Sequence, residues 1–219
     1  MNTIKIILAD DHTLVRAGLK ALLSLSAEFE VIGEAGDGEE AIRLVEDLQP
    51  DLLVLDLSMP HMGGTECIRE IRSRGIACRI LVLTMYDEES YIREVMQSGA
   101  DGYLLKKSAD TELIQAIHKI YCGGKYLNEE ISEVLIHSLQ QGFCQKEDTE
   151  TDPYVLLSIR EREVLRYLAQ GFSNSEIADI LTLSPKTIDT YRSRIMSKLN
   201  LRKKSELVQY AVQHGLFGA

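Results

Sequence analysis

The sequence predicts a doubly wound α/β domain with a five-stranded parallel sheet, followed by a small all-α domain of four helices. Three observations predict this organisation. The first 125 residues alternate short apolar runs with amphipathic stretches, the pattern of βα units. A polar, acidic stretch then interrupts the chain. Residues 153–219 have only helical periodicity and carry 10 Lys/Arg and 6 Asp/Glu, against 14 and 28 in the rest.

Five apolar runs are expected to form the sheet of the first domain, residues 1–125. They are Ile4 to Ala9, Val31 to Ala35, Asp51 to Leu55, Arg79 to Leu83 and Gly102 to Leu105. A stretch with helical spacing of apolar residues follows each run. Strands that are apolar along their whole length are typical of a parallel sheet covered by helices on both faces.

Residues 126–152 are interpreted as a linker that contains one short helix. That helix is expected from Asn128 to Leu139, with Asn128 as its N-cap, and the polar segment Gln140 to Asp152 follows it. The second domain, residues 153–219, is expected to hold four helices. Their predicted bounds are Ile159 to Ala169, Ser173 to Leu181, Pro185 to Leu199 and Ser205 to His214.

Reactive side chains follow four of the five predicted strands. Asp10 and Asp11 follow the first strand, Asp56 the third, Thr84 the fourth and Lys106 the fifth. Ligands of parallel α/β sheets bind beyond the carboxyl ends of the strands, so these side chains are expected at one edge. Crowded carboxylates repel one another unless a cation joins them, and a site with few protein oxygens suits Mg²⁺. The pattern therefore predicts a Mg²⁺ site.

Asp56 is the central residue of this predicted site. A carboxylate beside a metal, an ammonium and a hydroxyl group has what phosphoryl transfer requires. Asp56 would accept the phosphoryl group, Lys106 would pair with it and Thr84 would donate to it. Any one aspartate is equally well explained as a helix cap or turn residue, and His12 is better explained as a helix-start residue than as a base. An enzyme using these carboxylates, such as a carboxylate phosphatase, is the alternative.

Two closely spaced helices in the second domain form a predicted helix-turn-helix. Ser173 and Glu176 have the spacing of a capping box at the start of the first helix. Ser184 is a predicted N-cap with Pro185 at the first position of the second helix, so about three residues remain for the turn. The second helix of such a pair enters the major groove of DNA.

The second helix has an exposed face of cationic and hydrogen-bonding side chains. Cations there can neutralise phosphates, and small polar side chains can reach base edges or the DNA backbone. The candidate DNA-binding residues are Lys186, Thr187, Asp189, Thr190, Arg192, Ser193, Arg194 and Lys198. A cationic helix face by itself is more often only solvated. A four-helix adaptor that binds protein is the other alternative.

The motifs of the first domain resemble the receiver domain of bacterial response regulators. They are Ala-Asp10-Asp11-His, Leu-Asp56-Leu-Ser-Met-Pro60-His-Met-Gly63-Gly64, Leu-Thr84-Met and Gly102-Tyr103-Leu-Leu-Lys106. The resemblance implies a flavodoxin-like receiver in which a histidine kinase phosphorylates Asp56.

The resemblance also implies roles for the neighbouring residues. Asp10, Asp11 and the backbone carbonyl of Ser58 would bind Mg²⁺ together with Asp56. Thr84 and Tyr103 would act as switch residues that move with phosphorylation, although a half-buried tyrosine on a strand is also common. Lys107 stands where many members have proline, so the resemblance leaves open whether the peptide bond before it is cis.

The second domain looks like the LuxR-type four-helix module, and the whole chain resembles the NarL/FixJ subfamily of response regulators. The matching segments run from Leu157 to Leu165, from Gly171 to Ala178, from Lys198 to Leu201 and from Glu206 to Val208. In that subfamily the last helix mediates dimer formation on DNA, which makes Leu207, Val208 and Ala211 candidate interface residues. Asp189 and Ser193 depart from the lysine or other long polar residues common in relatives.

The sequence thus predicts a cytoplasmic response regulator, and not an enzyme, in which phosphorylation of Asp56 modulates sequence-specific DNA binding and transcription. Expected partners are promoter DNA, a histidine kinase and a second copy of the chain, with RNA polymerase as a further candidate. No apolar run approaches the roughly 18 residues needed to span a bilayer. The 4 cysteines form no C-x-x-C pair, so neither a zinc site nor a disulfide framework is indicated.

Overall fold

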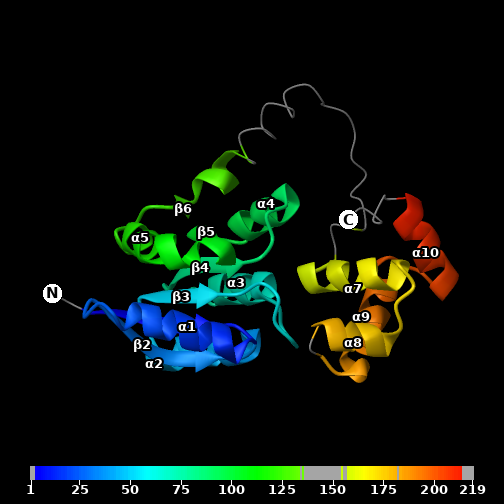
Figure 1. Cartoon of the computed structure of the whole chain (residues 1–219), viewed down its shortest axis with the longest axis horizontal. Helices are drawn as coiled ribbons and strands as arrows, with labels where there is room; N and C mark the ends of the chain where they lie inside the picture. The colour runs from blue at the N-terminus through cyan, green and yellow to red at the C-terminus, as the bar shows by residue number, and fades with distance from the viewer. Residues whose placement is uncertain (1–2, 134, 136–153, 155–156, 182, 214–219) are drawn as a thin grey trace. The chain divides into compact units, whose positions relative to one another are not determined.

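The computed structural model describes residues 3–133, 135, 154, 157–181 and 183–213 (Figure 1). The chain divides into two compact units, Met1–Lys146 and Glu147–Ala219. The predicted linker segment Gln140 to Asp152 and the predicted helix end at Leu139 lie outside the described residues. Each unit has its own secondary structure and its own core.

The first unit is a parallel sheet with strand order β2-β1-β3-β4-β5-β6. The strands are β1 (Ile4–Ala9), β2 (Phe29–Ala35), β3 (Leu52–Leu55), β4 (Arg79–Thr84), β5 (Gly102–Leu105) and β6 (Tyr126–Leu127). The helices are α1 (Thr13–Leu23), α2 (Gly38–Leu48), α3 (Gly64–Ser73), α4 (Glu89–Gln97), the 3₁₀ turn η1 (Lys106–Ser108) and α5 (Ala109–Tyr121). This order is the flavodoxin-like doubly wound arrangement, as predicted.

The predicted number of five strands is wrong, because a sixth short strand extends the sheet. Gly102 pairs with Tyr126 and Tyr103 pairs with Leu127. A strand of two residues is too short to show a periodic pattern in the sequence. Its pairing with β5 depends on the path of the chain after α5. The sheet therefore continues past the predicted domain end at residue 125. The predicted helix after it begins at Glu129, with Asn128 as its N-cap as predicted: the Asn128 Oδ1 accepts a hydrogen bond from the Ile131 amide at 3.2 Å.

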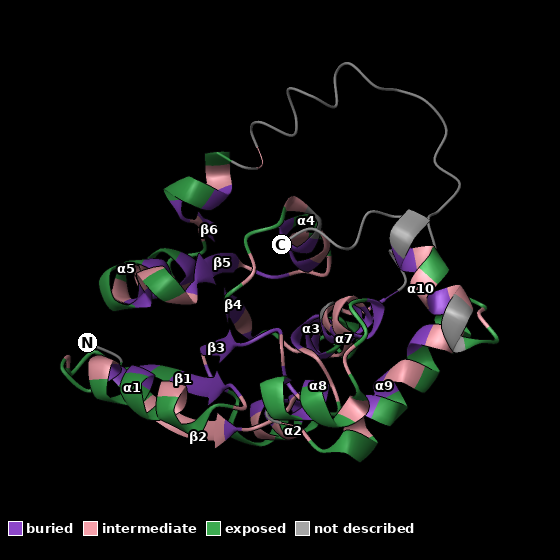
Figure 2. Cartoon of the chain, turned by 45° about the vertical axis from the view of Figure 1, so that its right-hand side comes forward, coloured by how far each residue is buried: buried purple, intermediate pink, exposed green. Residues whose placement is uncertain are grey.

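Helices cover both faces of the sheet (Figure 1). Alternate strand residues such as Ile6, Leu8 and Val54 pack with apolar residues of α1 and α5 in one core cluster. The intervening residues, such as Ile7 and Leu53, are also fully buried on the side of α2, α3 and α4. The central strands are therefore buried throughout, as their purple colour in Figure 2 shows.

The second unit consists of the four helices α7 (Ile159–Ala169), α8 (Asn174–Leu181), α9 (Pro185–Lys198) and α10 (Lys204–Gln213). Their apolar faces meet in one core that includes Leu165, Ile177, Ile188 and Leu207. The predicted helix bounds agree within one residue at each end, and the predicted last residue His214 lies outside the described residues. Helical periodicity in the sequence was sufficient to predict these helices, because each helix buries one apolar face.

Candidate phosphoacceptor site and nucleic-acid interface

The parallel register places the predicted acidic residues side by side. Ala9 pairs with Leu55, so Asp10 and Asp56 both come directly after paired residues. The Asp56 amide donates to the Ala9 carbonyl at 2.8 Å, which fixes the two strand ends together. On the other side of β4, Thr84 pairs with Leu105 of β5, so Lys106 leaves the sheet at the same edge. Side chains from four strands thus converge.

The Lys106 ammonium joins two of the carboxylates. Its Nζ lies 2.6 Å from Asp10 Oδ2 and 3.0 Å from Asp56 Oδ2. The second Asp56 oxygen, Oδ1, accepts the amide of Leu57 at 2.8 Å. Only about 4% of the Asp10 and Asp56 side-chain surfaces is exposed, so these contacts replace most of their hydration.

Burial raises the pKa of Asp56 to about 6. Lys106 opposes this shift by its positive charge and its hydrogen bond, whereas the negative charges of Asp10 and Asp11 add to it. The pKa of Lys106 is raised because attraction to Asp56 and Asp10 outweighs the opposing effect of desolvation, the largest single contribution. At neutral pH the site therefore holds an ionised, nucleophilic carboxylate beside a firmly protonated lysine.

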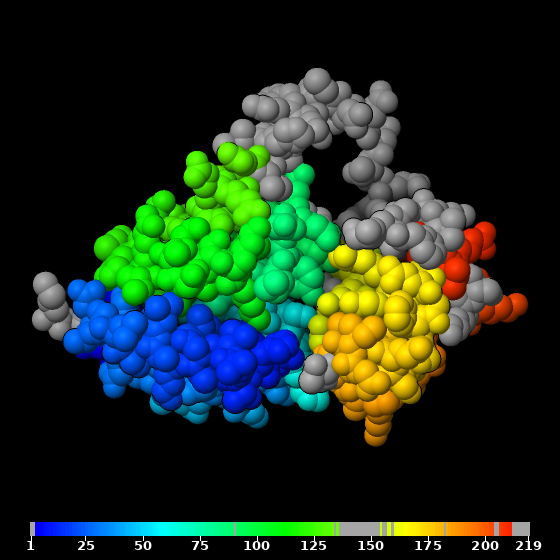
Figure 3. Space-filling model, viewed as in Figure 1, coloured from blue at the N-terminus to red at the C-terminus, as the bar shows by residue number. Residues whose placement is uncertain are grey.

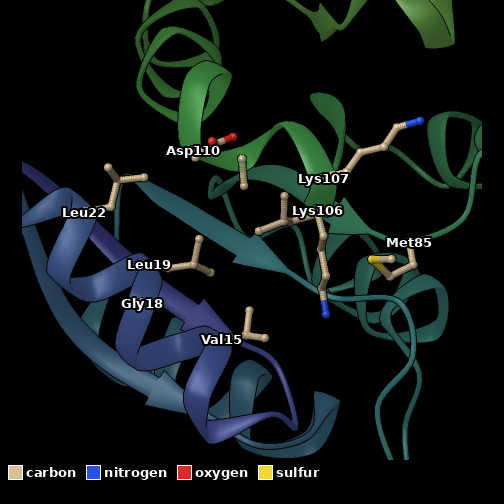
Figure 4. A pocket seen from close by; sticks show the side chains of 10 residues that line it. Val15, Gly18, Leu19, Leu22, Met85, Lys106, Lys107 and Asp110 are labelled. Carbon is tan, nitrogen blue, oxygen red and sulfur yellow. The ribbon is translucent and has the colours of Figure 1, made fainter.

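Lys106 and Lys107 leave η1 in opposite directions (Figure 4). Lys107 points away from the acidic edge and pairs with Glu130 at 2.6 Å. The peptide bond between the two lysines is trans, as are all those described. The stem of Lys106 also lines an apolar cavity of about 520 Å³ beside α1, lined further by Val15, Leu19 and Met85. The helices α1 and α5 that flank this region form a continuous surface in Figure 3.

The acidic edge fits a hard divalent cation. One oxygen or nitrogen atom each of Asp10, Asp11, His12 and Asp56 lies within 4.8 Å of the others. Asp11 Oδ1 is buried and accepts no hydrogen bond within the described residues, although the His12 Nδ1 lies 2.7 Å from it without hydrogen-bond geometry. Three carboxylates around one point, one with an unused buried oxygen, form an all-oxygen donor set of the kind that Mg²⁺ prefers.

Thr84 and Tyr103, the predicted switch residues, are both fully buried. The Thr84 Oγ1 accepts the amide of Tyr86 at 3.4 Å. The Tyr103 hydroxyl donates to the Tyr86 carbonyl at 2.8 Å, and burial raises its pKa well above the usual range. The Tyr103 ring is therefore already turned inward in this structure.

Sequence reasoning did not identify Tyr86 and Arg16 as parts of the site. The Tyr86 hydroxyl donates to Ser58 Oγ at 3.3 Å and so connects the loop after β4 to the loop after β3. Arg16 donates through Nη1 to the backbone carbonyl of Asp10. Position after a strand end was the only available signal for Tyr86. Arg16 gave none, because its partner at the acidic edge is a backbone atom.

The second unit has the capped geometry of a helix-turn-helix. The Ser173 amide donates to Glu176 Oε2 at 2.8 Å and the Glu176 amide donates to Ser173 Oγ at 3.3 Å, which is a capping box before α8. Ser184 accepts the Thr187 amide at 3.1 Å, with Pro185 at the first position of α9. Two short, independently capped helices therefore follow each other with three residues between them.

Two of the four predicted cations on α9 are engaged by carboxylates. Arg192 pairs with Asp189 at 2.5 Å, and Lys198 pairs with Glu161 of α7 at 2.6 Å. Lys186 and Arg194 are exposed and have no ion-pair partner among the described residues. Lys198 is therefore only partly available for the phosphate contact that the sequence predicted.

The small polar side chains of α9 make local hydrogen bonds. Thr190 and Ser193 donate to the carbonyls of Lys186 and Asp189, both at 3.0 Å, and Thr187 Oγ1 lies 2.8 Å from Ser184 Oγ. A hydroxyl group that donates to its own helix still has lone pairs that can accept a hydrogen bond from DNA. These residues remain candidates for DNA contact.

The three residues predicted for a dimer interface on α10 differ in how far they are exposed. Leu207 and Ala211 are buried, at 1% and 0% exposure, and Leu207 belongs to the core of the second unit. Helical periodicity identifies an apolar face but not what covers it, and here the helices of the same unit cover it. Val208 is half-buried and stays a candidate.

The first unit has acidic residues and a lysine at one edge of its sheet, and the second unit is a helix-turn-helix. This combination defines the class of signalling regulators that have a receiver domain and a DNA-binding output domain. Residues 6–118 match the response regulator receiver domain family, and residues 155–211 match the luxR family of bacterial regulatory proteins. The chain therefore belongs to the two-component response regulators of the NarL/FixJ subfamily, a family of transcription regulators and not a class of enzymes.

Curated relatives match over almost their whole length. The oxygen regulatory protein NreC of Staphylococcus carnosus is 40% identical over 97% of this chain and 98% of its own. NreC of Staphylococcus epidermidis is also 40% identical, over 97% of this chain and 98% of its own. The similarity thus covers both domains in the same order.

Solved structures agree with this assignment. The RcsB response regulator of Salmonella typhimurium has a TM-score of 0.58 at 31% identity, covering 97% of this chain and 100% of that one. RcsB has also been solved as a complex with DNA, at a TM-score of 0.58 and 31% identity, covering 96% of this chain and 98% of that one. Among the described residues, no helix has the length and apolarity needed to cross a membrane.

Proposed function

We propose that this chain is a phosphorylation-controlled transcription factor. In this proposal Asp56 takes a phosphoryl group from a histidine kinase, and the modified receiver changes how the second unit binds promoter DNA in the cytoplasm. The observation that carries the proposal is the position of Asp56, a buried carboxylate 3.0 Å from the Lys106 ammonium and surrounded by two further aspartates. That environment places a nucleophile beside an ammonium group and beside carboxylates that can hold a cation.

Phosphoryl transfer to Asp56 requires few catalytic groups from the protein. An Asp56 carboxylate oxygen attacks the phosphorus atom of the donor, the bond from phosphorus to the histidine nitrogen breaks, and an acyl phosphate forms. Lys106 neutralises charge on the transferred group. Thr84, at the end of β4, supplies a hydroxyl donor for a phosphoryl oxygen.

Asp10, Asp11, Asp56 and the Ser58 carbonyl would hold Mg²⁺. When bound, the cation supplies positive charge that offsets the crowding of carboxylates and phosphoryl oxygens. The residues of the chain also orient the acceptor: the Leu57 amide and Lys106 hold one oxygen of Asp56 each. The carboxylate is therefore fixed in place before the donor arrives.

Phosphorylation would change the surface of the first unit next to Thr84 and Tyr103. Movement of these residues would shift α4 and the neighbouring strand β5, which alters the surface that the receiver presents. Such a shift would release the second unit or favour association of two copies. A dimer bound to promoter DNA, with RNA polymerase as a further partner, is the end point of this proposal.

Phosphoryl uptake tests the acceptor. Full-length wild type and Asp56→Asn would be incubated with Mg²⁺ and a radiolabelled small phosphodonor such as acetyl phosphate. We expect labelled wild type and no label on the variant. Asp47→Asn is the matched control, because Asp47 is exposed on α2 and lies outside the acidic cluster. Equal labelling of wild type and Asp56→Asn would show that the acceptor lies elsewhere.

A gel-shift experiment tests the output. Wild-type protein with the phosphodonor should retain particular promoter fragments over random ones of equal length. A protein-binding adaptor would show no such sequence-dependent retention. Lys186→Ala together with Arg194→Ala should weaken retention strongly, because these exposed cations have no carboxylate partner among the described residues of the second unit.

A further inference from the structure

We propose that Asp189 determines sequence specificity by selecting cytosine, whose N4 amino group lies in the major groove. The proposal rests on the proposed function, since it requires that α9 binds DNA. Asp189 lies in the second turn of α9, and the amino-terminal part of the second helix in a helix-turn-helix faces the base edges. It is the single acidic residue of that helix.

The Asp189 side chain is held in place but remains open to a ligand. Its Oδ1 accepts hydrogen bonds from Arg192 Nη2 at 2.5 Å and from Asn174 Nδ2 at 3.4 Å. Arg192 lies on the same helix, whereas Asn174 begins α8, so the contacts come from both helices of the motif. The side chain is still 54% exposed. A carboxylate can accept about four hydrogen bonds, so further acceptor capacity remains.

An acidic group on a DNA-binding surface costs free energy, because it faces the phosphate charges. Arg192 reduces that cost by pairing with the carboxylate, and the pair then brings little net charge to the surface. Asp189 therefore does not add affinity in general. It can contribute only where the DNA offers a hydrogen-bond donor, and this makes it selective.

The chemistry of the major groove identifies the preferred donor. Cytosine presents its N4 amino group there, and aspartate accepts a hydrogen bond from it. Guanine presents only the acceptors O6 and N7, and thymine presents O4 and a methyl group. Adenine also presents an amino group, N6, but its N7 acceptor lies beside that group and repels the second carboxylate oxygen. A carboxylate opposite guanine or thymine would be left without a partner and repelled by the oxygen. Asp189 thus favours cytosine both by attraction and by exclusion.

Selection from a pool of random duplexes tests this assignment. Full-length wild type, Asp189→Asn and Asp189→Ala would each be given the same pool with the phosphodonor, and the retained duplexes would be sequenced. For wild type we expect a preference for cytosine at one position of each half-site. Asparagine pairs best with adenine, so Asp189→Asn should move that preference to adenine. Asp189→Ala should lower the discrimination there by on the order of tenfold.

Asp179→Asn is the matched control, since it makes the same chemical change at an exposed position of α8. It should leave the base preference unchanged. The assignment is overturned if Asp189→Asn keeps the wild-type preference at every position, or if Asp179→Asn shifts the preference in the same way. If wild type itself shows no base preference anywhere, the proposed function fails instead.

Discussion

At the scale of single residues, burial governs the chemistry of the acidic edge. Asp56 loses most of its hydration, which raises its pKa to about 6, and Lys106 only partly offsets this effect. The native state therefore holds the Asp56 proton more tightly than the unfolded chain does. As the pH rises from about 4 through about 6, ionisation of Asp56 costs folding free energy. The buried acidic edge thus lowers the stability of the fold when Asp56 is ionised.

We predict that Asp56→Asn stabilises the first unit at pH 7.5 in the presence of a chelator. The gain in free energy of unfolding should be about 3 kcal/mol, because the variant buries no charge at this position. The gain should disappear below about pH 4, where the wild-type carboxyl is protonated in both states. Urea unfolding of the full-length protein, followed by circular dichroism at several pH values, measures it. A gain that does not depend on pH would contradict the assigned cause.

At the scale of elements, close backbone approach positions the loop that follows β3. A Cβ atom on Gly64, the first residue of α3, would lie 2.4 Å from the Asp56 carbonyl oxygen and 2.8 Å from the Leu57 Cα. Both neighbours are backbone atoms and cannot turn aside. Gly64 therefore lets α3 begin directly against Asp56.

Substitution of Gly64 by alanine should push the loop away from Asp56. We expect Gly64→Ala to lower the free energy of unfolding by about 1 to 3 kcal/mol and to slow labelling by the phosphodonor. Gly18→Ala is the control, because its Cβ would meet no atom within 4 Å on α1. That control should stabilise the helix by about 0.5 to 1 kcal/mol and leave labelling unchanged. Similar effects of both variants would rule out the steric explanation.

Pairing between helices also decides which cations of α9 serve DNA binding. Lys198 is held by Glu161, which is 2% exposed and also accepts the Ser158 amide at 2.7 Å. On a generic duplex, Lys186→Ala should reduce the slope of log K against log salt by about 0.9, the value for one phosphate contact. Lys198→Ala should change the slope much less. Equal slope changes would mean that Lys198 leaves Glu161 when DNA binds.

At the scale of the whole molecule, the two compact units differ in charge. Residues 153–219 carry an excess of basic side chains, whereas the remainder is acidic. Coupling between them therefore requires that phosphorylation changes the free energy of one state relative to another. The Asp56 site and the capped helix-turn-helix are the two ends of the coupling that we propose.

We predict that the phosphodonor changes the affinity of wild type for its selected DNA by about 5- to 150-fold, the usual range of allosteric coupling. The affinity of Asp56→Asn should not respond to the donor. Titration of each protein on the same duplex, with and without donor, measures this effect. An identical response of both proteins would separate DNA binding from Asp56 while leaving the two domain assignments intact.

The sequence by itself determined the features that depend on neighbours along the chain. Apolar runs gave the five main strands, and the polar residues after four of these runs gave Asp10, Asp11, Asp56, Thr84 and Lys106. Serine caps and Pro185 gave the start of α8 and α9. These signals are local, because periodicity and capping involve residues within about one or two turns.

Only the tertiary structure decided which partner each side chain meets. It added the β6 pairing, buried Leu207 and Ala211 in their own unit, tied Lys198 to Glu161 and connected Tyr86 to Ser58. The β6 pairing, the Lys198–Glu161 ion pair and the Tyr86–Ser58 hydrogen bond each join residues far apart in the sequence. Leu207 packs in the core of its unit. A periodic pattern specifies which face of an element is apolar or charged, but the contact itself depends on how the chain brings distant elements together.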